Sequence, residues 1–213
     1  MKKYNLPTAS QKVETVILAN GEFPSYSIPL SILNHCNYLV CCDGATNNLY
    51  KTSKSPDAIV GDCDSLSEDN RIRYSSIIHC ISEQETNDLT KAVNFCRERD
   101  LKTITIVGAT GKREDHTIAN ISLLCEYMND CEAQIITDYG IFIAIDRPAV
   151  FESKIGQQVS IFSIDRCSIT TNGLKYPIKN QTFNNWWQAT LNESTETEFS
   201  IDTNGRTIIY RAF

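Results

Sequence analysis

The feature that most constrains the fold is a series of short apolar segments in the first two thirds of the chain. They are rich in Val and Ile, have few polar interruptions, and span residues 14–19, 38–42, 58–60, 77–81, 103–107 and 133–137. Short, nearly continuous apolar runs are typical of strands that are buried on both faces of a parallel sheet. Amphipathic stretches lie between several of these runs. The alternation predicts an α/β fold with right-handed crossover connections.

Three segments between the apolar runs carry helical patterns, over residues 29–36, 87–99 and 115–128. In the second of them Leu89, Val93 and Cys96 share one stripe, because they follow each other at the spacing of helical turns. Asn87 stands where a helix N-cap is expected. These segments are therefore predicted to be the helices that cover the parallel sheet.

The pattern changes near residue 140, where helical periodicity ends. Strand-like runs over residues 140–146, 158–164, 197–202 and 207–212 follow, and Asn204 with Gly205 marks a hairpin turn between the last two. The sequence therefore predicts two domains. Residues 1–140 form a parallel-sheet α/β domain, and residues 141–213 form a small all-β domain.

Charge and hydropathy exclude two classes of partner. The chain of 213 residues carries 20 basic and 26 acidic side chains, for a net charge of −6. No basic patch of the kind that binds nucleic acid is expected. No apolar run approaches the ~20 residues of a membrane span, and the N-terminus lacks the apolar core of a signal peptide. We expect neither a nucleic-acid partner nor a membrane partner.

The nine cysteines bear on the cellular compartment. Their number is odd, no Cys-x-x-Cys pair occurs, and many of them sit inside apolar runs. This distribution argues against a disulfide scaffold and against a zinc site. The expectation is that all nine are free thiols that pack as small apolar side chains in a reducing cytoplasm, without an intramolecular disulfide.

Acidic residues follow the predicted strands. Asp43, Asp62 and Asp64 come directly after two of the apolar runs, Asp88 opens a helix, and Asp115 lies in the loop after a further run. In an open α/β sheet, ligands bind outside the carboxyl ends of the strands. Carboxylate and phosphate oxygens are the ligands that Mg²⁺ prefers. The pattern therefore predicts a Mg²⁺ site with ligands among these acids.

The segment around Asp62 supports this hypothesis but leaves an alternative open. Asp62 and Asp64 share one face of an extended segment, so both carboxylates could address one ion. Gly61 would let a phosphate approach the backbone closely. The alternative is a solvated turn with two exposed acids, and the short motif alone is compatible with both.

Cationic and glycine residues near the acids suit a polyphosphate. Lys91 follows Asp88 by one helical turn, and the loop before the third predicted helix contains Gly108, Gly111, Lys112 and Arg113. Glycine-rich loops that lead into a helix bind anions through free backbone N–H groups. The loop is not a Walker A motif, because its glycines are too close together and Arg follows Lys.

The histidines are compatible with two roles. His116 stands at the start of a helix beside the acidic and basic residues, where it is a candidate general base. A histidine at a helix start also commonly makes structural hydrogen bonds, and this alternative stays open. We expect His35 and His79 to be structural, since neither belongs to a recognisable motif.

Taken in order, five motifs resemble those of the thiamine pyrophosphokinase family: CDGATN, VGDCDSL, ETNDLTKA, GATGKREDHTIANI and NGLKYPI. The resemblance implies transfer of the pyrophosphoryl group of ATP to the hydroxyl of thiamine, which gives thiamine diphosphate and AMP. It also implies a catalytic α/β domain with Mg²⁺, a C-terminal β-sandwich that helps to hold thiamine, and a homodimer with thiamine sites between the subunits.

The resemblance also implies roles for individual residues. Mg²⁺ ligands are expected at Asp62, Asp64 and Asp88, and catalytic groups at Asp62, Asp88, Lys91, Arg113 and Asp115. Residues expected to bind the nucleotide are Asp43, Gly44, Gly61, Ser65, Gly108, Gly111, His116 and Asn120. Those expected to contact thiamine are Tyr176, Asn192 and Glu193, although Tyr176 could instead be an aromatic that packs in the β-sandwich. Which acid accepts the proton of the thiamine hydroxyl stays open.

The chain departs from the family pattern at several positions. Ala45 replaces a glycine, Asn87 replaces Thr, Lys112 stands where Gly is frequent, and Leu191 replaces Ser. The change at Leu191, together with Tyr176 in place of the frequent Trp, leaves the thiamine contacts less defined than the phosphate chemistry. Two other functions stay open: a Mg²⁺-dependent phosphotransferase that releases ADP, and a thiamine or nucleotide sensor without catalysis.

Overall fold

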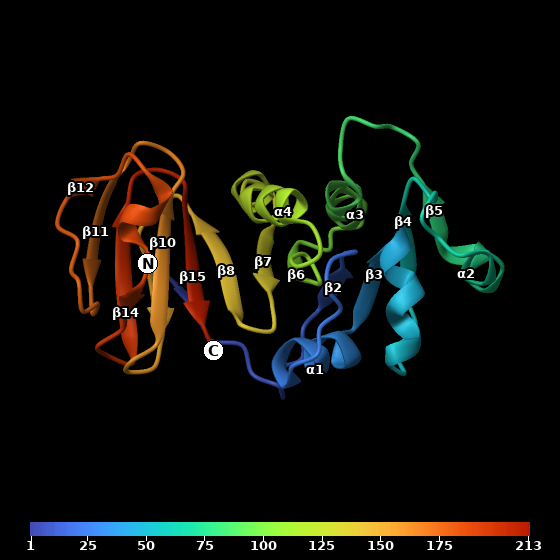
Figure 1. The fold of residues 1–213 in the computed structure, drawn as a ribbon, viewed down its shortest axis with the longest axis horizontal. Helices are drawn as coiled ribbons and strands as arrows, with labels where there is room; N and C mark the ends of the chain where they lie inside the picture. The colour runs from blue at the N-terminus through green and yellow to red at the C-terminus, as the bar shows by residue number, and fades with distance from the viewer. The chain divides into compact units, whose positions relative to one another are not determined.

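A parallel sheet forms the centre of residues Thr8–Asp138, which we call the α/β unit (Figure 1). The computed structural model describes all residues from Met1 to Phe213. The sheet contains strands β2 (Thr15–Leu18), β3 (Tyr38–Cys42), β4 (Ala58–Gly61), β5 (Ile78–Cys80), β6 (Thr103–Val107) and β7 (Glu132–Ile136). Their order is β7-β6-β2-β3-β4-β5, and every pair is parallel. The chain runs from β2 outward to β5 and returns beside β2 with β6, so the direction of winding reverses between β2 and β6.

The central strands are buried on both faces, as the apolar runs predicted. All residues of β2 and β4 are buried, and so are four of the five residues of β3. Val16, Ile17, Val40 and Ile59 are completely inaccessible to solvent. The parallel α/β architecture expected from the sequence is confirmed.

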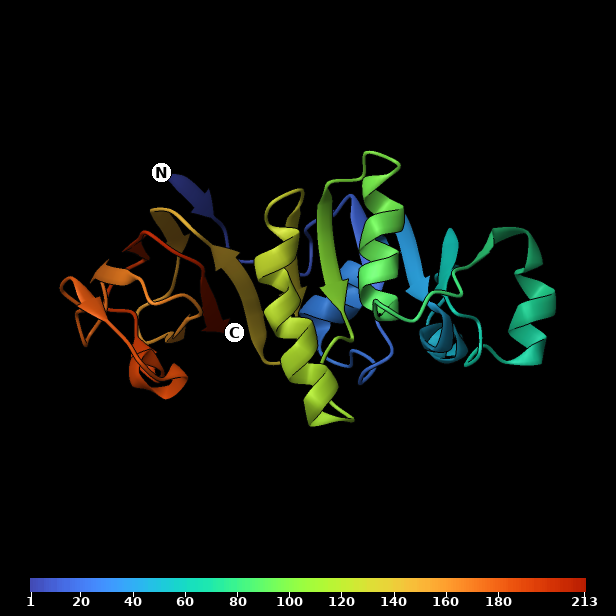
Figure 2. The same cartoon turned by 90° about the horizontal axis from the view of Figure 1, so that it is seen from above.

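Helices cover the sheet on both faces (Figures 1 and 2). Helix α1 (Ser27–His35) lies on one face, and α3 (Asp88–Arg97) and α4 (Glu114–Tyr127) lie on the other. Asn87 is the N-cap of α3, and its side chain accepts a hydrogen bond from the backbone of Thr90 at 2.9 Å. None of the helices combines the length and the apolar composition required to cross a membrane.

The hydrophobic pattern of the sequence did not predict several short helical elements. These are η1 (Asp43–Lys51), α2 (Glu68–Arg73) and η2 (Ser75–Ile77) in the α/β unit, and η3 (Trp186–Ala189) near the C-terminus. Helix α2 has no buried residue and is only six residues long, so it has no apolar stripe that a periodicity could reveal. Ser67 caps α2 by accepting a hydrogen bond from the backbone of Asn70.

The remaining residues, Met1–Pro7 and Tyr139–Phe213, are called the β unit here. Their strands belong to two sheets. One sheet contains β1 (Lys2–Tyr4), β9 (Ala149–Glu152), β14 (Glu198–Thr203), β11 (Ser168–Asn172) and β12 (Gln181–Thr182), in that order. The other contains β13 (Asn192–Glu193), β10 (Gln158–Ser163), β15 (Thr207–Ala212) and β8 (Gly140–Ile145). The predicted hairpin is wrong: β14 pairs with β9 and β11, whereas β15 pairs with β8 and β10, so the turn at Asn204 and Gly205 joins strands of different sheets. The β-rich C-terminal fold is confirmed.

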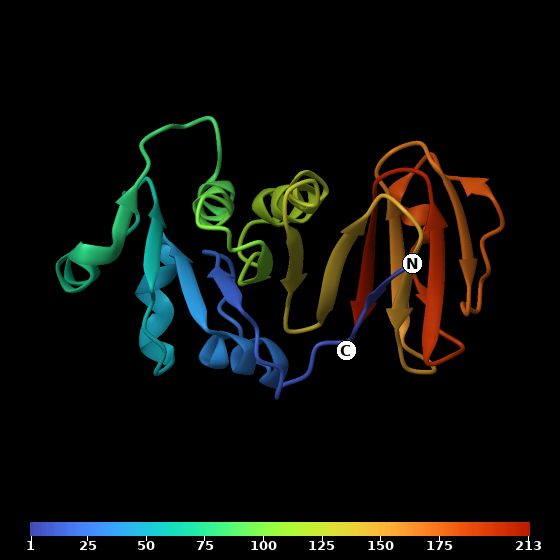
Figure 3. The same cartoon turned by 180° about the vertical axis from the view of Figure 1, so that it is seen from behind.

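The first residues of the chain differ from the expected domain division, which placed them with the α/β domain. Strand β1 pairs in parallel with β9, so Met1–Pro7 belong to the β unit (Figure 3). The guanidinium of Arg211, only 1% exposed, holds this segment by donating to the backbone oxygens of Tyr4 and Asn5. A three-residue strand carries too little pattern to reveal such a distant partner.

The expectation for the cysteines is wrong at one pair. Cys63 and Cys80 form a disulfide, with their Cα atoms 5.7 Å apart. The other seven cysteines are buried and form no disulfide, as expected from their apolar surroundings. The pair escaped the sequence argument because its two residues meet only when β4 and β5 lie side by side.

Candidate active site

Three carboxylates meet at the carboxyl edge of the parallel sheet. Asp43 follows β3 and begins η1, while Asp62 and Asp64 follow β4. One carboxylate oxygen from each side chain lies within 4.8 Å of the other two. Asp43 is 1% exposed, Asp62 is partly exposed and Asp64 is exposed, so the cluster opens to solvent on one side. Three hard oxygen donors at this spacing suit a divalent cation such as Mg²⁺.

A fourth acid and a buried cation lie beside this cluster. Gly61 separates Asp43 from Asp88: a Cβ on Gly61 would lie 3.0 Å from Cγ of Asp43 and 3.2 Å from Oδ1 of Asp88. Nζ of Lys91 lies 3.5 Å from Oδ1 of Asp88, and Lys91 is only 3% exposed. The acids expected to act together are thus assembled around a residue that must be small.

The electrostatics show that this site is rich in negative charge. Burial raises the pKa of Asp43, and the neighbouring charges of Asp62 and Asp64 add to that effect. Burial also raises the pKa of Asp88, with added repulsion from Asp43 and Asp62. The pKa of Asp62 is lowered, chiefly because its carboxylate accepts a hydrogen bond from the backbone N–H of Asp64. Bringing a cation here relieves repulsion between carboxylates.

Backbone N–H groups orient the buried acid of the cluster. The N–H groups of Gly44 and Ser65 both donate to the Asp43 carboxylate. The Ser65 hydroxyl donates to Oδ1 of Asp64 at 2.8 Å. Gly44 and Ser65, expected beside the nucleotide, are therefore placed at the acid cluster, where they fix two of its three carboxylates.

A second part of the edge is formed by the loop between β6 and α4. Gly108 and Gly111 both have positive φ, of 67° and 76°. The backbone N–H of Gly21 donates to the oxygen of Gly108 at 2.7 Å, so the loop after β2 is joined to the loop after β6. These are the two central strands where the winding reverses, which is the position at which α/β sheets bind ligands.

Asn20, which belongs to none of the sequence motifs, connects the two parts. Nζ of Lys112 donates to the backbone oxygen of Asn20 at 3.0 Å and to its Oδ1 at 3.1 Å. The side-chain nitrogen of Asn20 occupies the space where a Cβ on Gly44 would lie. Asn20 could have been found from its place directly after the apolar run 14–19, because ligands bind outside the carboxyl ends of the strands and this run is one of those strands.

Arg113 and Asp115 pair with each other and do not join the acid cluster. Nε of Arg113 lies 3.1 Å from Oδ1 of Asp115, and Nη2 lies 2.6 Å from Oδ2. Both side chains are exposed, and the hydrogen bonds from Arg113 lower the pKa of Asp115 to about 2. His116 is exposed in the first turn of α4, where its backbone N–H also donates to Asp115.

Asn120 is committed to contacts within the protein. Its Nδ2 donates to the backbone oxygen of Ala109 at 2.8 Å, and its Oδ1 accepts from Nδ2 of Asn87 at 3.2 Å. Asn87 in turn caps the helix that begins with Asp88. Asn120 therefore ties the loop after β6 to the start of α3.

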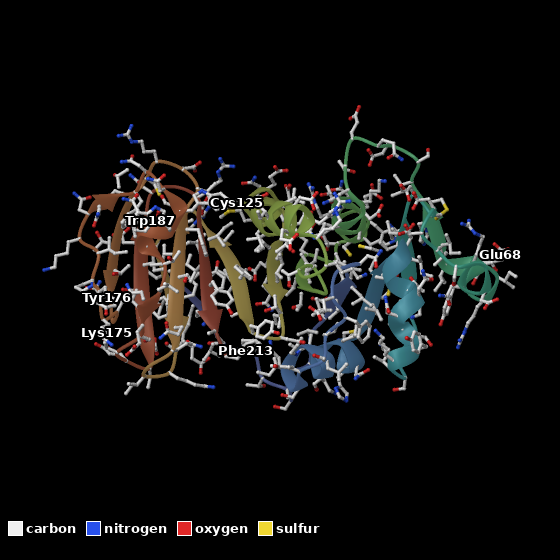
Figure 4. All side chains as sticks on the ribbon, in the orientation of Figure 1. Glu68, Cys125, Lys175, Tyr176, Trp187 and Phe213 are labelled. Carbon is white, nitrogen blue, oxygen red and sulfur yellow. A yellow bond between two sulfur atoms is a disulfide. The ribbon has the colours of Figure 1, made fainter.

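The three residues expected to contact thiamine lie together in the β unit. The Asn192 amide accepts a hydrogen bond from the backbone N–H of Tyr176 and donates to its oxygen, at 3.1 Å and 2.8 Å. Glu193 forms an ion pair with Lys175 at 3.2 Å. The Tyr176 ring is held at the surface, 62% exposed, beside Lys175 (Figure 4). The ring does not pack in the sandwich core.

Comparison with known families gives the decisive observation. Residues 30–136 match the model described as thiamin pyrophosphokinase, catalytic domain, and residues 140–210 match the model described as thiamin pyrophosphokinase, substrate-binding domain. The chain belongs to the thiamin pyrophosphokinase family. The acid cluster lies within the first matched segment, and Tyr176, Asn192 and Glu193 lie within the second.

Individual members of the thiamin pyrophosphokinase family are distant in sequence. A Caenorhabditis elegans protein named thiamin pyrophosphokinase 1 is 29% identical over 132 residues, which are 57% of this chain and 54% of the relative. A rice protein named thiamine pyrophosphokinase 1 is 26% identical over 199 residues, covering 78% of this chain and 74% of the relative.

Solved structures share the fold. The thiamine pyrophosphokinase of Bacillus subtilis superposes with a TM-score of 0.79 at 22% identity, covering 93% of this chain and 99% of that one. The yeast thiamin pyrophosphokinase gives a TM-score of 0.78 at 20% identity, covering 100% of this chain and 91% of the other. The match therefore extends over both units.

Proposed function

We propose that this chain transfers the pyrophosphoryl group of ATP to the hydroxyl of thiamine and releases thiamine diphosphate and AMP. The observation that carries the proposal is the acid cluster at the carboxyl edge of the sheet, within a segment that matches the family's catalytic domain. Membership of the thiamin pyrophosphokinase family supports thiamine and ATP as the substrates.

Asp43, Asp62 and Asp64 fit a Mg²⁺ ion, because their oxygens converge and their mutual repulsion favours a cation. Asp88 stands close enough, across Gly61, to serve the same ion or a second one. When bound there, Mg²⁺ would neutralise charge on the triphosphate. The protein supplies the preorganised carboxylates and the backbone N–H groups that orient them.

Two cationic side chains have separable tasks in this proposal. Lys91 is buried beside Asp88, so its position relative to the acids is fixed and it is suited to stabilise charge on the transferred group. Arg113 is exposed and is held by Asp115 at the start of α4, so it is suited to meet the nucleotide as it enters. The glycines at 108 and 111 have positive φ and lie against Ala19 and Glu22, so they shape the loop that leads into α4.

The proton of the thiamine hydroxyl needs an acceptor. A carboxylate with a raised pKa holds a proton better than one with a lowered pKa. Asp43 and Asp88 have raised pKa values, whereas Arg113 holds the pKa of Asp115 at about 2. We therefore place the acceptor at Asp88, which lies outside the three clustered ligands, and assign Asp115 to the positioning of Arg113.

The thiamine contact is proposed for the β unit. The exposed Tyr176 ring offers an aromatic face to the cationic thiazolium or the flat pyrimidine of thiamine. The amide of Asn192 is engaged with the Tyr176 backbone, so Asn192 acts by holding that residue in place. We further propose a cytoplasmic homodimer in which Tyr176 of one subunit serves the acid cluster of its partner.

Product analysis tests the proposed reaction. The purified protein is incubated with Mg²⁺, ATP and thiamine, and AMP, ADP and the thiamine phosphates are quantified. We expect AMP and thiamine diphosphate in equal amounts, and no AMP when thiamine is omitted. Formation of ADP with thiamine monophosphate would indicate a phosphotransferase, and binding without turnover would indicate a sensor.

A further inference from the structure

The Cys63–Cys80 disulfide lies within the metal-binding segment of the candidate site. Cys63 stands between Asp62 and Asp64, two of the three clustered acids. Cys80 is the last residue of β5, the edge strand of the parallel sheet. The covalent bond therefore joins the loop that carries two clustered carboxylates to a different strand.

The disulfide also reaches the segment that leads to the fourth acid. Cys80 is paired with Gly61 in the register of β4 and β5, and the next backbone N–H, of Ile81, donates to the oxygen of Gly61 at 2.8 Å. From there the chain passes through an exposed loop to Asp88 at the start of α3. One covalent bond thus links the segment that carries Asp62 and Asp64 to the start of the segment that leads to Asp88.

The loop conformation around Cys63 depends on such support. Cys63 has a φ of 68°, in the left-handed region that non-glycine residues rarely adopt. Its backbone oxygen accepts a hydrogen bond from the Arg71 guanidinium. Strand β5 has only three residues and pairs on one side only, so few noncovalent contacts keep the end of the loop in place.

The position of Cys80 makes this pair chemically accessible. Cys80 is exposed, whereas Cys63 is 4% exposed. Every cysteine outside the pair is buried and forms no disulfide. Thiol–disulfide exchange requires access to a sulfur atom, so Cys80, the exposed residue of the pair, is the expected point of attack.

We propose that Cys63 and Cys80 form a site of reversible thiol–disulfide modification that controls how tightly the acid cluster holds a divalent cation. In the forward direction, the two thiols and one low-molecular-weight disulfide give the protein disulfide and two small thiols. Two electrons pass to the small disulfide, and the two cysteine protons end on its thiol products. A dithiol reverses the exchange and is itself oxidised. The proposal rests on the proposed function only in taking the acids as cation ligands.

The disulfide form is the tight-binding form. The bond closes a segment with a sequence separation of 17 residues, and it limits the conformations that Asp62 and Asp64 can adopt before the cation arrives. Reduction releases the loop from β5, so cation binding must then order it. Loss of groups that orient metal ligands typically weakens metal affinity by about tenfold or more.

Differential alkylation tests the chemistry. The native protein is treated with oxidised glutathione or with a reductant, blocked with iodoacetamide, then denatured, reduced and labelled with a second reagent for peptide mass analysis. We expect Cys63 and Cys80 to be protected together after oxidised glutathione, and Cys80 to react first after reduction. If both carry the first label after oxidised glutathione, the proposed modification is wrong.

Titration with Mn²⁺ in the absence of nucleotide tests the consequence without any activity assay. We expect the oxidised protein to bind Mn²⁺ about tenfold more tightly than the reduced protein, measured by electron paramagnetic resonance after removal of the reductant. Cys80→Ser should bind as weakly as the reduced form and should not respond to redox treatment. Cys131→Ser, which removes a buried cysteine outside the pair, should respond like the wild type.

The outcomes separate this proposal from the proposed function. Equal Mn²⁺ affinity in the oxidised and reduced forms overturns the redox control and leaves the pyrophosphokinase reaction standing. Absence of Mn²⁺ binding in both forms overturns the redox control and removes the metal site from the proposed function as well. Folding of Cys80→Ser is checked by its thermal transition, and Cys80→Ala provides a second variant that lacks the disulfide.

Discussion

At the scale of single residues, the environment of Asp43 has two opposing effects on its negative charge. Its carboxylate is almost completely buried and lies beside two other acids, which raises its pKa, yet it accepts hydrogen bonds from two backbone N–H groups. A buried charge that is retained at a cost in stability is common where a site must bind a cation. The metal-free protein therefore carries a local electrostatic penalty at neutral pH.

Replacement of Asp43 should reveal that penalty. Because the folded-state pKa is raised, the contribution of Asp43 to stability is present below its unfolded pKa and is lost as the pH rises through the folded value. We expect Asp43→Asn to raise the thermal midpoint of the metal-free protein by ~2–4 °C at pH 7, the shift that corresponds to about 1 kcal/mol in a chain of this size.

Thermal unfolding followed by fluorescence, with EDTA present, measures the effect of Asp43→Asn. The gain over the wild type should shrink as the pH is lowered toward the ordinary pKa of an aspartate. Addition of Mg²⁺ should stabilise the wild type and should have little effect on the variant. A variant that is less stable than the wild type at pH 7 in EDTA would contradict the interpretation.

Replacement of Asp62 tests the metal assignment through the catalytic rate. Asp62→Asn preserves the shape of the side chain and removes the charge, so we expect kcat to fall by about 100-fold or more while the fold is retained. Steady-state kinetics at saturating Mg²⁺ and a circular dichroism spectrum provide the measurement. Asp69→Asn, which changes an exposed acid of α2 outside the cluster, should leave kcat unchanged. A comparable kcat for Asp62→Asn would refute the assignment.

At the scale of elements, the active edge depends on contacts between loops that follow different strands. Asn120 on α4 binds the backbone of Ala109 after β6 and the side chain of Asn87 before α3. Each such hydrogen bond contributes about 1 kcal/mol. Asn120 therefore positions the glycine loop relative to the helix that begins with Asp88.

Loss of these two contacts should weaken nucleotide binding more than chemistry. We expect Asn120→Ala to raise the KM for ATP by about fivefold to thirtyfold, with a smaller change in kcat, since one or two hydrogen bonds of about 1 kcal/mol each correspond to these factors. Initial rates over a range of ATP concentrations give both constants. Asn129→Ala is the matched control, because its amide only donates to the backbone oxygen of Glu126 near the end of α4. An unchanged KM for Asn120→Ala would exclude a positioning role.

At the scale of the whole molecule, the proposed homodimer shares each site between its two subunits. The acid cluster belongs to the α/β unit and Tyr176 belongs to the β unit. In a two-fold dimer both shared sites are equivalent. A defect in the acids of one subunit can then be complemented by an intact acid cluster in the other.

A mixing experiment tests this sharing. Asp62→Asn and Tyr176→Ala, each nearly inactive alone, are unfolded, mixed equally and refolded. Random pairing makes half of the dimers mixed, and each mixed dimer has one intact site, so activity should recover to about a quarter of the wild type. Heterodimers are confirmed by mass spectrometry. Heterodimers without recovered activity would reject the shared site and leave the reaction itself unaffected.

Much of the architecture follows from the sequence for a simple physical reason. Strands buried on both faces must be apolar along their whole length. The segments that form β2, β3 and β4 can therefore be recognised from their own residues alone. The acids at Asp43, Asp62 and Asp64 could be placed at one edge, because parallel strands bring their carboxyl ends together.

Other features were decided only by the tertiary structure. The pairing of β1 with β9, the Cys63–Cys80 disulfide and the contact of Asn20 with Lys112 each join segments that are distant along the chain or on neighbouring strands. Hydrophobic periodicity reports how much of a segment is buried and with which repeat. It carries no information on which strand edges meet or which polar side chains face each other. Those contacts arise from the packing of the whole sheet, and they hold the predicted acids in place.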